Sequence, residues 1–302
     1  MLSNGRTFLR AAAMCSVAFA PACSLLVSVD ELSSPGTSTE GGPTVDGAST
    51  DGPSADGPGA DGGTLPGDGG GPSDGPMADA SWPPIGCGVA QNDPSLLAYF
   101  AFDDGAGGTL KDCSGRGHAG TIAGTPVWTT GKYGGALSFN GTDTCVDLGA
   151  GTDLRLGTFT LTAWANVTTY VPGGLGGHIV SKSTGNPNAI GWRFSTIASN
   201  EFETKLAVNG GSPFSVASPA GEPTATWVHV AFVLVPTQRA DIYVGGARVA
   251  NGVSPPAIYE EVAASMRLGC NAGTKDYYKG ALDELRIYTR ALSDAELAAL
   301  AK

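Results

Sequence analysis

The segment that most constrains the fold lies near the C-terminal end, at Gly280–Leu297. Leu285 and Ile287 alternate there with polar or amphipathic residues, which is the period-two pattern of a strand with one buried face. Ser293, followed three residues later by Glu296, forms a capping-box pair. The pattern therefore predicts a strand that leads directly into a short helix.

A strand this late in the chain needs a partner, because its backbone donors and acceptors must be satisfied. The segment Leu96–Asp103 is equally apolar and stands where the folded part of the chain begins. We expect the two segments to pair antiparallel, which would close residues 94–302 into one domain.

The segments between these two ends also favour strands. Alternation over Phe159–Ala165 predicts a two-faced strand, and Trp227–Val235 is apolar on both faces, as in the middle of a sheet. Arg239–Val249 is typical of a hairpin, with Gly245 and Gly246 at the turn. All-β sandwiches of a couple of hundred residues are often single domains, so we expect one.

Residues 1–22 have the pattern of an export signal. Two arginines precede the apolar run Ala11–Ala20, which is too short to span a bilayer as a helix. Ala20–Ala22 fits ordinary signal peptidase, whereas Cys23 fits a bacterial lipoprotein in which this cysteine is acylated. We favour an outer-membrane or cell-surface lipoprotein because a long polar segment follows, although Ala20 replaces the usual leucine. A freely secreted or periplasmic protein is the alternative.

Residues 23–93 are predicted to be a disordered tether rich in Gly, Asp and Pro. Residues 24–83 contain ten acidic residues and no Lys or Arg, and residues 33–83 have almost no large apolar side chain. Such a segment cannot bury enough surface to offset its ordering entropy. Its Asp-Gly repeats lack the spacing of calcium-binding loops, so we interpret them as a solvated spacer.

Residues 84–302 hold eighteen acidic and fifteen basic residues, a net charge of −3. This balance excludes a strongly basic patch and argues against nucleic acid as a partner.

Four cysteines remain after the signal and the anchor candidate. An even number in an exported chain favours two disulfides, and zinc is disfavoured because there is no Cys-x-x-Cys pair. Of the three possible connectivities we favour one, because antiparallel first and last strands would bring Cys113, Cys145 and Cys270 to one end. The favoured pairs are Cys145–Cys270 and Cys87–Cys113.

Several motifs occur in an order that is more specific than any one of them. This run covers residues 94–302 and resembles the laminin-G-like domains of the concanavalin A-like lectin/glucanase superfamily. The resemblance implies a two-sheet antiparallel jelly-roll sandwich with a short C-terminal helix, a fold that hosts lectins, adhesion modules and glycanases. The motifs are Tyr99–Asp103, Asp112–Thr121, Gly134–Gly141, Phe159–Trp164, Trp227–Phe232, Ile242–Gly246 and Leu282–Leu297.

The sequence argues against catalysis. Glucanases of this superfamily carry a Glu-x-Asp-x-(x)-Glu run on one strand, and no such run is present. Glu201 and Glu203 come nearest but lack the third acid, and a solvated strand face explains them. Asp283 and Glu284 are adjacent, so a regular strand would point them to opposite faces. His229 matches a structural position of the family. We therefore expect a non-enzyme; a divergent glycoside hydrolase or polysaccharide lyase is the alternative.

The resemblance also implies a structural calcium ion. It would sit where the first strand, the Phe-Asn-Gly loop and the last strand converge, with Asp103 or Asp104, the backbone at Asn140 and Gly141, and Asp283 as ligands. Calcium takes six to eight oxygen ligands of this kind. The alternative is that these carboxylates only bond the amides of turns and loops.

Lectins of this fold stack aromatic rings on sugars, and several rings here stand near Gly, Asn or Lys. We expect an envelope-tethered binding module that recognises a polysaccharide, a glycoconjugate or a cell-surface protein, with a purely structural or adhesion scaffold as a further alternative. The candidate ligand-binding residues are Trp192, Phe194, Tyr277, Tyr278, Tyr170 and His178.

Overall fold

The structure is a computed structural model that describes most of the C-terminal two thirds of the chain. Every described residue belongs to the compact unit Pro72–Lys302. The predicted signal, Cys23 and most of the predicted tether lie outside the described residues. The described residues are 86–89, 91–170, 176–184, 191–207, 212–253, 255, 257, 264–272 and 276–302.

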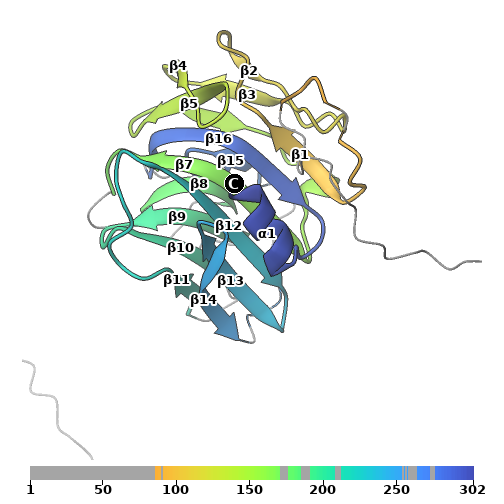
Figure 1. Cartoon of the computed structure of the whole chain (residues 1–302), viewed down its shortest axis with the longest axis vertical. Coiled ribbons are helices and arrows are strands. Elements are labelled where there is room, and N and C mark those ends of the chain that lie inside the picture. Colours follow the sequence, from red (N-terminus) through yellow and green to blue (C-terminus); the bar gives the residue numbers. More distant parts are fainter. Residues whose placement is uncertain are drawn as a thin grey trace, which may run out of the picture. The chain divides into compact units, whose positions relative to one another are not determined.

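Two antiparallel sheets form the domain, as the all-β prediction requires (Figure 1). A 3₁₀ turn η1 (Thr152–Leu154) and a helix α1 (Asp294–Leu300) complete the described elements. Sheet A consists, in spatial order, of β14 (Ala247–Val253), β13 (Arg239–Val244), β12 (Trp227–Val235), β7 (Phe159–Val167), β16 (Lys279–Tyr288), β5 (Gly135–Asn140) and β4 (Val127–Thr130), and β1 (Leu96–Phe100) also pairs with β16. Sheet B consists of β11 (Phe214–Ala217), β10 (Glu201–Leu206), β9 (Gly191–Ile197), β8 (Gly177–Ser183), β15 (Met266–Leu268), β6 (Cys145–Asp147), β3 (Gly120–Ala123) and β2 (Thr109–Leu110).

The first and last strands of the domain lie side by side. β1 pairs antiparallel with β16, with Leu96 opposite Tyr288 and Phe100 opposite Leu285. This pairing confirms the expectation drawn from the two apolar segments. The central strand β12 and the β13–β14 hairpin are also confirmed, with Gly245 and Gly246 at positive φ in the turn.

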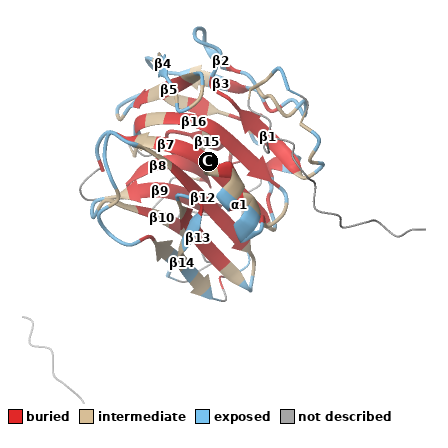
Figure 2. Cartoon of the chain, viewed as in Figure 1, coloured by how far each residue is buried: buried red, intermediate tan, exposed pale blue. Residues whose placement is uncertain are grey.

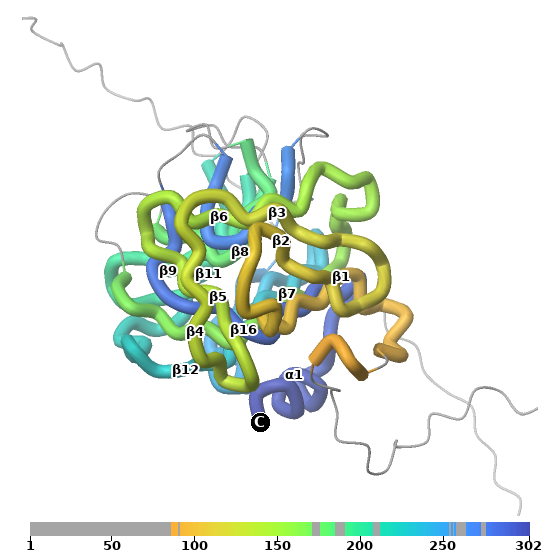
Figure 3. The backbone as a smooth tube through the Cα atoms, turned by 90° about the horizontal axis from the view of Figure 1, so that it is seen from above, coloured from red at the N-terminus to blue at the C-terminus, as the bar shows by residue number. Residues whose placement is uncertain are grey.

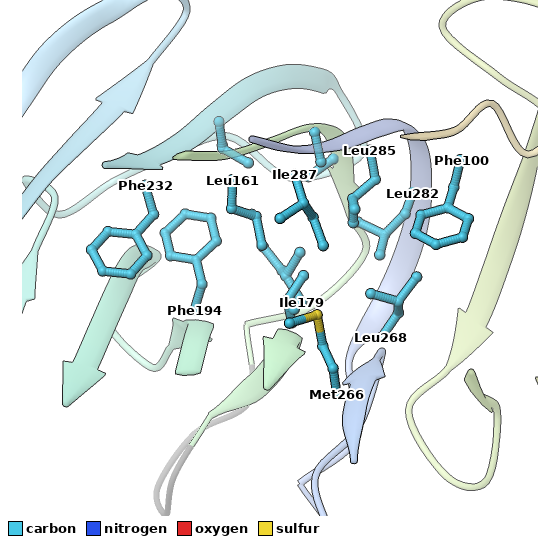
Figure 4. Close-up of a cluster of buried hydrophobic side chains, with 14 of the residues drawn as sticks. Phe100, Leu161, Ile179, Phe194, Phe232, Met266, Leu268, Leu282, Leu285 and Ile287 are labelled. Carbon is cyan, nitrogen blue, oxygen red and sulfur yellow. The ribbon is translucent and has the colours of Figure 1, made fainter. Parts of the chain in front are cut away.

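The core lies between the two sheets. Sheet A contributes side chains such as Leu161, Phe232 and Ile287, and sheet B contributes Ile179 and Phe194. Figure 4 shows these side chains pointing toward one another from the facing sheets. The alternation of apolar residues in the sequence therefore marks the inner faces of both sheets.

The outer face of sheet A is also buried, which differs from the expectation of one buried face for the last strand. A second apolar cluster joins Tyr99 of β1, Val233 of β12 and Tyr288 of β16 to Leu297 and Leu300 of α1. The helix packs over the sheet there, and Figure 2 shows these strands buried along most of their length. The predicted capping box of Ser293 and Glu296 is present and begins this helix.

Two disulfides close the domain in the predicted pairs. Cys87 bonds Cys113 and Cys145 bonds Cys270, with Cα–Cα distances of 4.6 and 5.4 Å. The described chain packs on the sandwich from its start at residue 86, which Figure 3 draws in orange on the same side as α1. An ion pair of 2.8 Å between Asp93 and Arg290 also holds this segment. Among the described residues, no helix has the length and apolar character needed to cross a membrane.

A candidate binding face and a candidate metal centre

Strand β9 alternates apolar and polar side chains over Trp192–Ser195. Trp192 and Phe194 belong to the core between the sheets. Because successive side chains of a strand point to opposite faces, Arg193 and Ser195 lie on the outer face of sheet B. The same rule places Glu203 and Lys205 of β10 on that face, since Phe202 and Leu206 are core residues.

Strand pairing lines these polar residues up in two rows across sheet B. His178 and Ser181 are three positions apart, which in a regular strand would put their side chains on opposite faces. A register shift between His178 and Val180 places both on the same face. Directly paired residues on one face lie about 5 Å apart at Cβ, so each row is continuous. We call the six residues the polar face: His178, Ser195 and Glu203 form one row, and Ser181, Arg193 and Lys205 form the next.

His178 is the buried end of the first row. Its Nδ1 lies 2.8 Å from the Ser195 hydroxyl, and its Nε2 lies 3.7 Å from a carboxylate oxygen of Asp276. Burial lowers the pKa of His178, although the nearby carboxylate of Asp276 opposes that change. Tyr277 forms a β-bridge with His178 and is half-buried, so its ring stands beside this row.

A serine, a histidine and a carboxylate in contact invite comparison with a nucleophilic centre. Such a centre needs an accessible hydroxyl and a base held by a hydrogen bond to the carboxylate. Ser195 is fully buried, and the 3.7 Å between His178 and Asp276 exceeds a hydrogen bond. The geometry fits a structural contact that fixes the histidine ring.

Arg193 is the centre of the second row. The residue is 6% exposed, and its Nε has no hydrogen-bond partner among the described residues. Burial lowers the pKa of Arg193, and the charges of Glu203 and Asp276 only partly oppose this effect. Lys205 lies directly opposite and forms an ion pair of 3.6 Å with Glu203.

The aromatic candidates from the sequence are mostly placed in the core. Trp192, Phe194, Tyr170 and Tyr278 are all buried members of the cluster between the sheets, and Trp192 is 1% exposed. A ring buried in this way has no face free to stack on a ligand from solution, so the structure corrects this part of the prediction. Of the six candidates, it brings only Tyr277 and His178 to the polar face.

Arg193, Ser195 and Lys205 were not among the residues predicted from the sequence to bind a ligand. The alternation of apolar and polar residues along β9 and β10 could have identified them. If Trp192 and Phe194 are core residues, then Arg193 and Ser195 must share the opposite face. The sequence does not, however, show which strands pair, and the rows exist only through that pairing.

Asp283 is the strongest candidate for a metal ligand. Its carboxylate is buried, Oδ2 accepts a hydrogen bond of 2.9 Å from the Tyr133 amide, and Oδ1 has no partner among the described residues. Burial, together with the nearby charges of Glu284 and Asp103, raises the pKa of Asp283 to about 7. A buried carboxylate oxygen without a hydrogen-bond partner is suited to binding a cation.

Asp103, three residues after the end of β1, contacts the same turn. Its Oδ1 accepts a hydrogen bond of 2.6 Å from the Gly135 amide. A Cβ on Gly134 would meet this carboxylate, and a Cβ on Gly131 would meet that of Asp283. Glycine is therefore required at both positions because the backbone of the turn passes so close to the two acids.

The remaining predicted metal ligands lie elsewhere. Asn140 pairs with Lys279 at the end of β5 opposite to Gly135, and its Oδ1 accepts amides of its own loop, including that of Thr142. Five residues of strand separate Asn140 from Gly135, or about 17 Å. Asp104 is exposed and accepts the Lys111 amide. Of the predicted ligands, the structure therefore brings together only Asp103 and Asp283, and the prediction of Asn140, Gly141 and Asp104 as ligands beside them is corrected. The described residues contain no group of three or more His, Cys, Asp or Glu side chains suited to a metal ion.

A buried ion pair adjoins this turn. Arg286 contacts Glu284 at 2.6 Å and lies over the Tyr99 ring, whose hydroxyl donates to the same carboxylate at 2.8 Å. Glu284 adopts φ +51, within a register shift of β16 between Asp283 and Arg286. The strand is therefore irregular at this point, in contrast to the regular alternation expected for Asp283 and Glu284.

With this geometry established, comparison with known proteins identifies the family. The model of the concanavalin A-like lectin/glucanases superfamily matches residues 140–298, which is more than half of the chain. The chain belongs to this superfamily. No curated protein matches the sequence.

Solved structures share the fold at low sequence identity. The binding domain of Paraclostridial Mosquitocidal Protein 1 has a TM-score of 0.57 and 14% identity, covering 68% of this chain and 52% of that chain. The binding domain of botulinum neurotoxin DC, in complex with rat synaptotagmin II, has a TM-score of 0.55 and 14% identity, covering 68% and 51%. Domain 4 of AbnA, a GH43 extracellular arabinanase from Geobacillus stearothermophilus in complex with arabinotriose, has a TM-score of 0.50 and 22% identity, covering 69% and 98%. The chain spans about half the length of the two toxin binding domains.

Proposed function

We propose that the domain is a non-catalytic binding module that recognises a glycoconjugate or a protein surface through the polar face of sheet B. The observation that carries the proposal is the pair of cross-strand rows centred on Arg193 and Ser195. Glu203 and Lys205, the partly exposed members of these rows, present an anionic and a cationic group, the chemistry that bonds the hydroxyls of sugars. The similar solved structures support this reading, because those named above are binding domains or a domain crystallised with an arabinose trisaccharide.

The test uses a glycan array and a pull-down from cell-surface extracts with the full chain. Glu203→Ala and Lys205→Ala remove two partly exposed members of the polar face. We expect each to weaken binding at least tenfold. The control is Thr129→Ala on β4, an exposed position of sheet A. Failure of the wild-type protein to bind any glycan or surface protein would contradict the proposal, and so would equal binding by all variants.

We further propose that a structural calcium ion binds beside Asp103 and Asp283. The unpartnered Oδ1 of Asp283 and the two carboxylates beside one glycine turn support it. Carboxylates and backbone carbonyls are the ligands that calcium prefers. A bound cation would neutralise the buried negative charge of the ionised Asp283. It would also hold β1 and β16 to the turn at residues 131–135.

Calcium is tested by thermal unfolding with calcium chloride or with a chelator. We expect calcium to raise the unfolding temperature of the wild-type protein, since a ligand that binds only the folded state stabilises it. Asp283→Asn and Asp103→Asn should lose this rise, whereas Asp104→Asn should keep it. An unfolding temperature that does not respond to calcium would rule out the site.

The location of the protein is proposed from its first residues alone. We propose that Cys23 carries a lipid that anchors the domain to the cell envelope, with the following polar segment as a spacer. Cell fractionation of the full chain should find it in membranes, and Cys23→Ser should release it into the soluble fraction. Equal release of both proteins would favour a freely secreted form.

A further inference from the structure

Arg193 has fewer compensating contacts than a buried guanidinium requires. A guanidinium presents five N–H donors, and leaving one buried without a partner costs stability. Nε of Arg193 is such a donor among the described residues. Of the two carboxylates that influence Arg193, Glu203 also pairs with Lys205, and Asp276 also contacts His178.

The row through Arg193 contains two further cations. Pairing of β6, β15, β8, β9 and β10 continues the row, so that Asp147, Arg267, Ser181, Arg193 and Lys205 follow one another across sheet B. Asp147 is already paired with Arg267 at 3.0 Å. Arg193 and Lys205 are direct neighbours, and like charges in that position destabilise a sheet. An anionic ligand would relieve this repulsion.

We propose that the ligand of the polar face is a glycan that carries carboxylate groups, such as a polysaccharide of uronic acids, and that Arg193 binds the carboxylate. This inference rests on the function proposed above and names its ligand class. A guanidinium can donate two parallel hydrogen bonds to one carboxylate. It is also more weakly hydrated than an ammonium, so removing its water on binding costs less. Lys205 and Arg267, with side chains 29% and 24% exposed, present further positive charge on either side.

The chemistry of the face favours a glycan over an acidic protein. The centres of protein interfaces are enriched in apolar and aromatic residues. The exposed large hydrophobic residues in the described part of the chain are Val89, Val127 and Val253, and none of them lies on sheet B. Charged groups with one ring at the edge can bind a sugar chain, and the polar face and Tyr277 provide them.

The experiment compares two matched probes by titration calorimetry on the full chain. The first is oligogalacturonate, and the second is the same oligosaccharide with its carboxyl groups reduced to alcohols. We expect the wild-type protein to bind the acidic probe at least tenfold more tightly, with an affinity that falls as salt rises. Arg193→Gln should abolish this preference, and Arg193→Lys should keep part of it. The control is Lys279→Gln, an exposed cation on β16 of sheet A.

The wild-type comparison stands even if Arg193→Gln does not fold, because it needs no variant. Equal affinity for the two probes, or tighter binding of the reduced probe, would overturn the inference while leaving a glycan-binding function in place. Binding of an acidic protein alone would also overturn it. No binding of any glycan or protein would instead contradict the proposed function itself.

Discussion

Lys205 lies directly opposite Arg193 on the antiparallel strands β10 and β9, and both residues belong to the face of sheet B that points away from the core. Twelve positions separate them in the sequence, and a turn between two strands brings them together. The candidate binding face is therefore a product of strand register. Its members come from strands whose inner faces build the core, so substitutions should divide cleanly into those that affect stability and those that affect binding.

Trp192→Ala is expected to act on stability. The ring is buried and stands 4.7 Å from the Phe159 ring, so its removal should lower the free energy of unfolding by about 3–5 kcal/mol. Tyr277→Ala, at the half-buried edge of the polar face, should cost less stability but weaken ligand binding. Chemical denaturation and calorimetry on both variants would check this, and the reverse order of effects would refute the assignment of the core.

The two disulfides should contribute unequally to stability. Cys145–Cys270 spans 125 residues and Cys87–Cys113 spans 26, and the chain-entropy model gives upper values of about 5 and about 3.5 kcal/mol. Replacing Cys145 and Cys270 by serine should therefore lower the denaturation midpoint more than replacing the other pair. Urea unfolding of the two double variants measures the difference. A larger loss from the shorter loop would mean that native-state contacts, and not loop closure, dominate.

Glu284→Gln is expected to be strongly destabilising. It leaves Arg286 buried against the Tyr99 ring without its carboxylate, and breaking a buried ion pair from one side costs about 3–5 kcal/mol. Tyr99→Phe removes only one hydroxyl that donates to this carboxylate, so its cost should be about 1–3 kcal/mol. Urea denaturation at neutral pH compares the two. Similar losses would show that Arg286 finds another partner.

His229 should make stability depend on pH. Burial, together with the charge of Arg286, lowers the pKa of His229 to about 3 from its usual 6.5. The unfolded chain then binds a proton below pH 6.5 that the folded chain does not, so stability is full above that pH and falls as the pH drops toward 3. The slope contributed is about 1.4 kcal/mol per pH unit at most.

The measurement is urea unfolding of the wild-type protein and of His229→Gln at several pH values between 7 and 4. Glutamine can keep a hydrogen bond to Thr162, which contacts the histidine at 2.6 Å. The pH dependence of the variant should be flatter by about one proton. Parallel curves for the two proteins would place the titration on another group.

The sequence alone was sufficient for the fold and for the closure of the domain. The apolar character of Leu96–Asp103 and Leu282–Tyr288, the capping box at Ser293 and the presence of two disulfides were predicted correctly, because each depends on local sequence or on an even count of thiols. Hydrophobic alternation fixes which side chains face inward, whatever strand lies beside them.

The tertiary structure alone decided which polar residues gather. The sequence proposed aromatic rings for binding, yet Trp192 and Phe194 fill the core because a ring near glycines can still face inward. The family resemblance also joined Asn140 to Asp283, whereas the glycine turn at residues 131–135 contacts the Asp283 carboxylate at the other end of β5. Pairing register is set by contacts between strands far apart in the chain, and no local pattern encodes it.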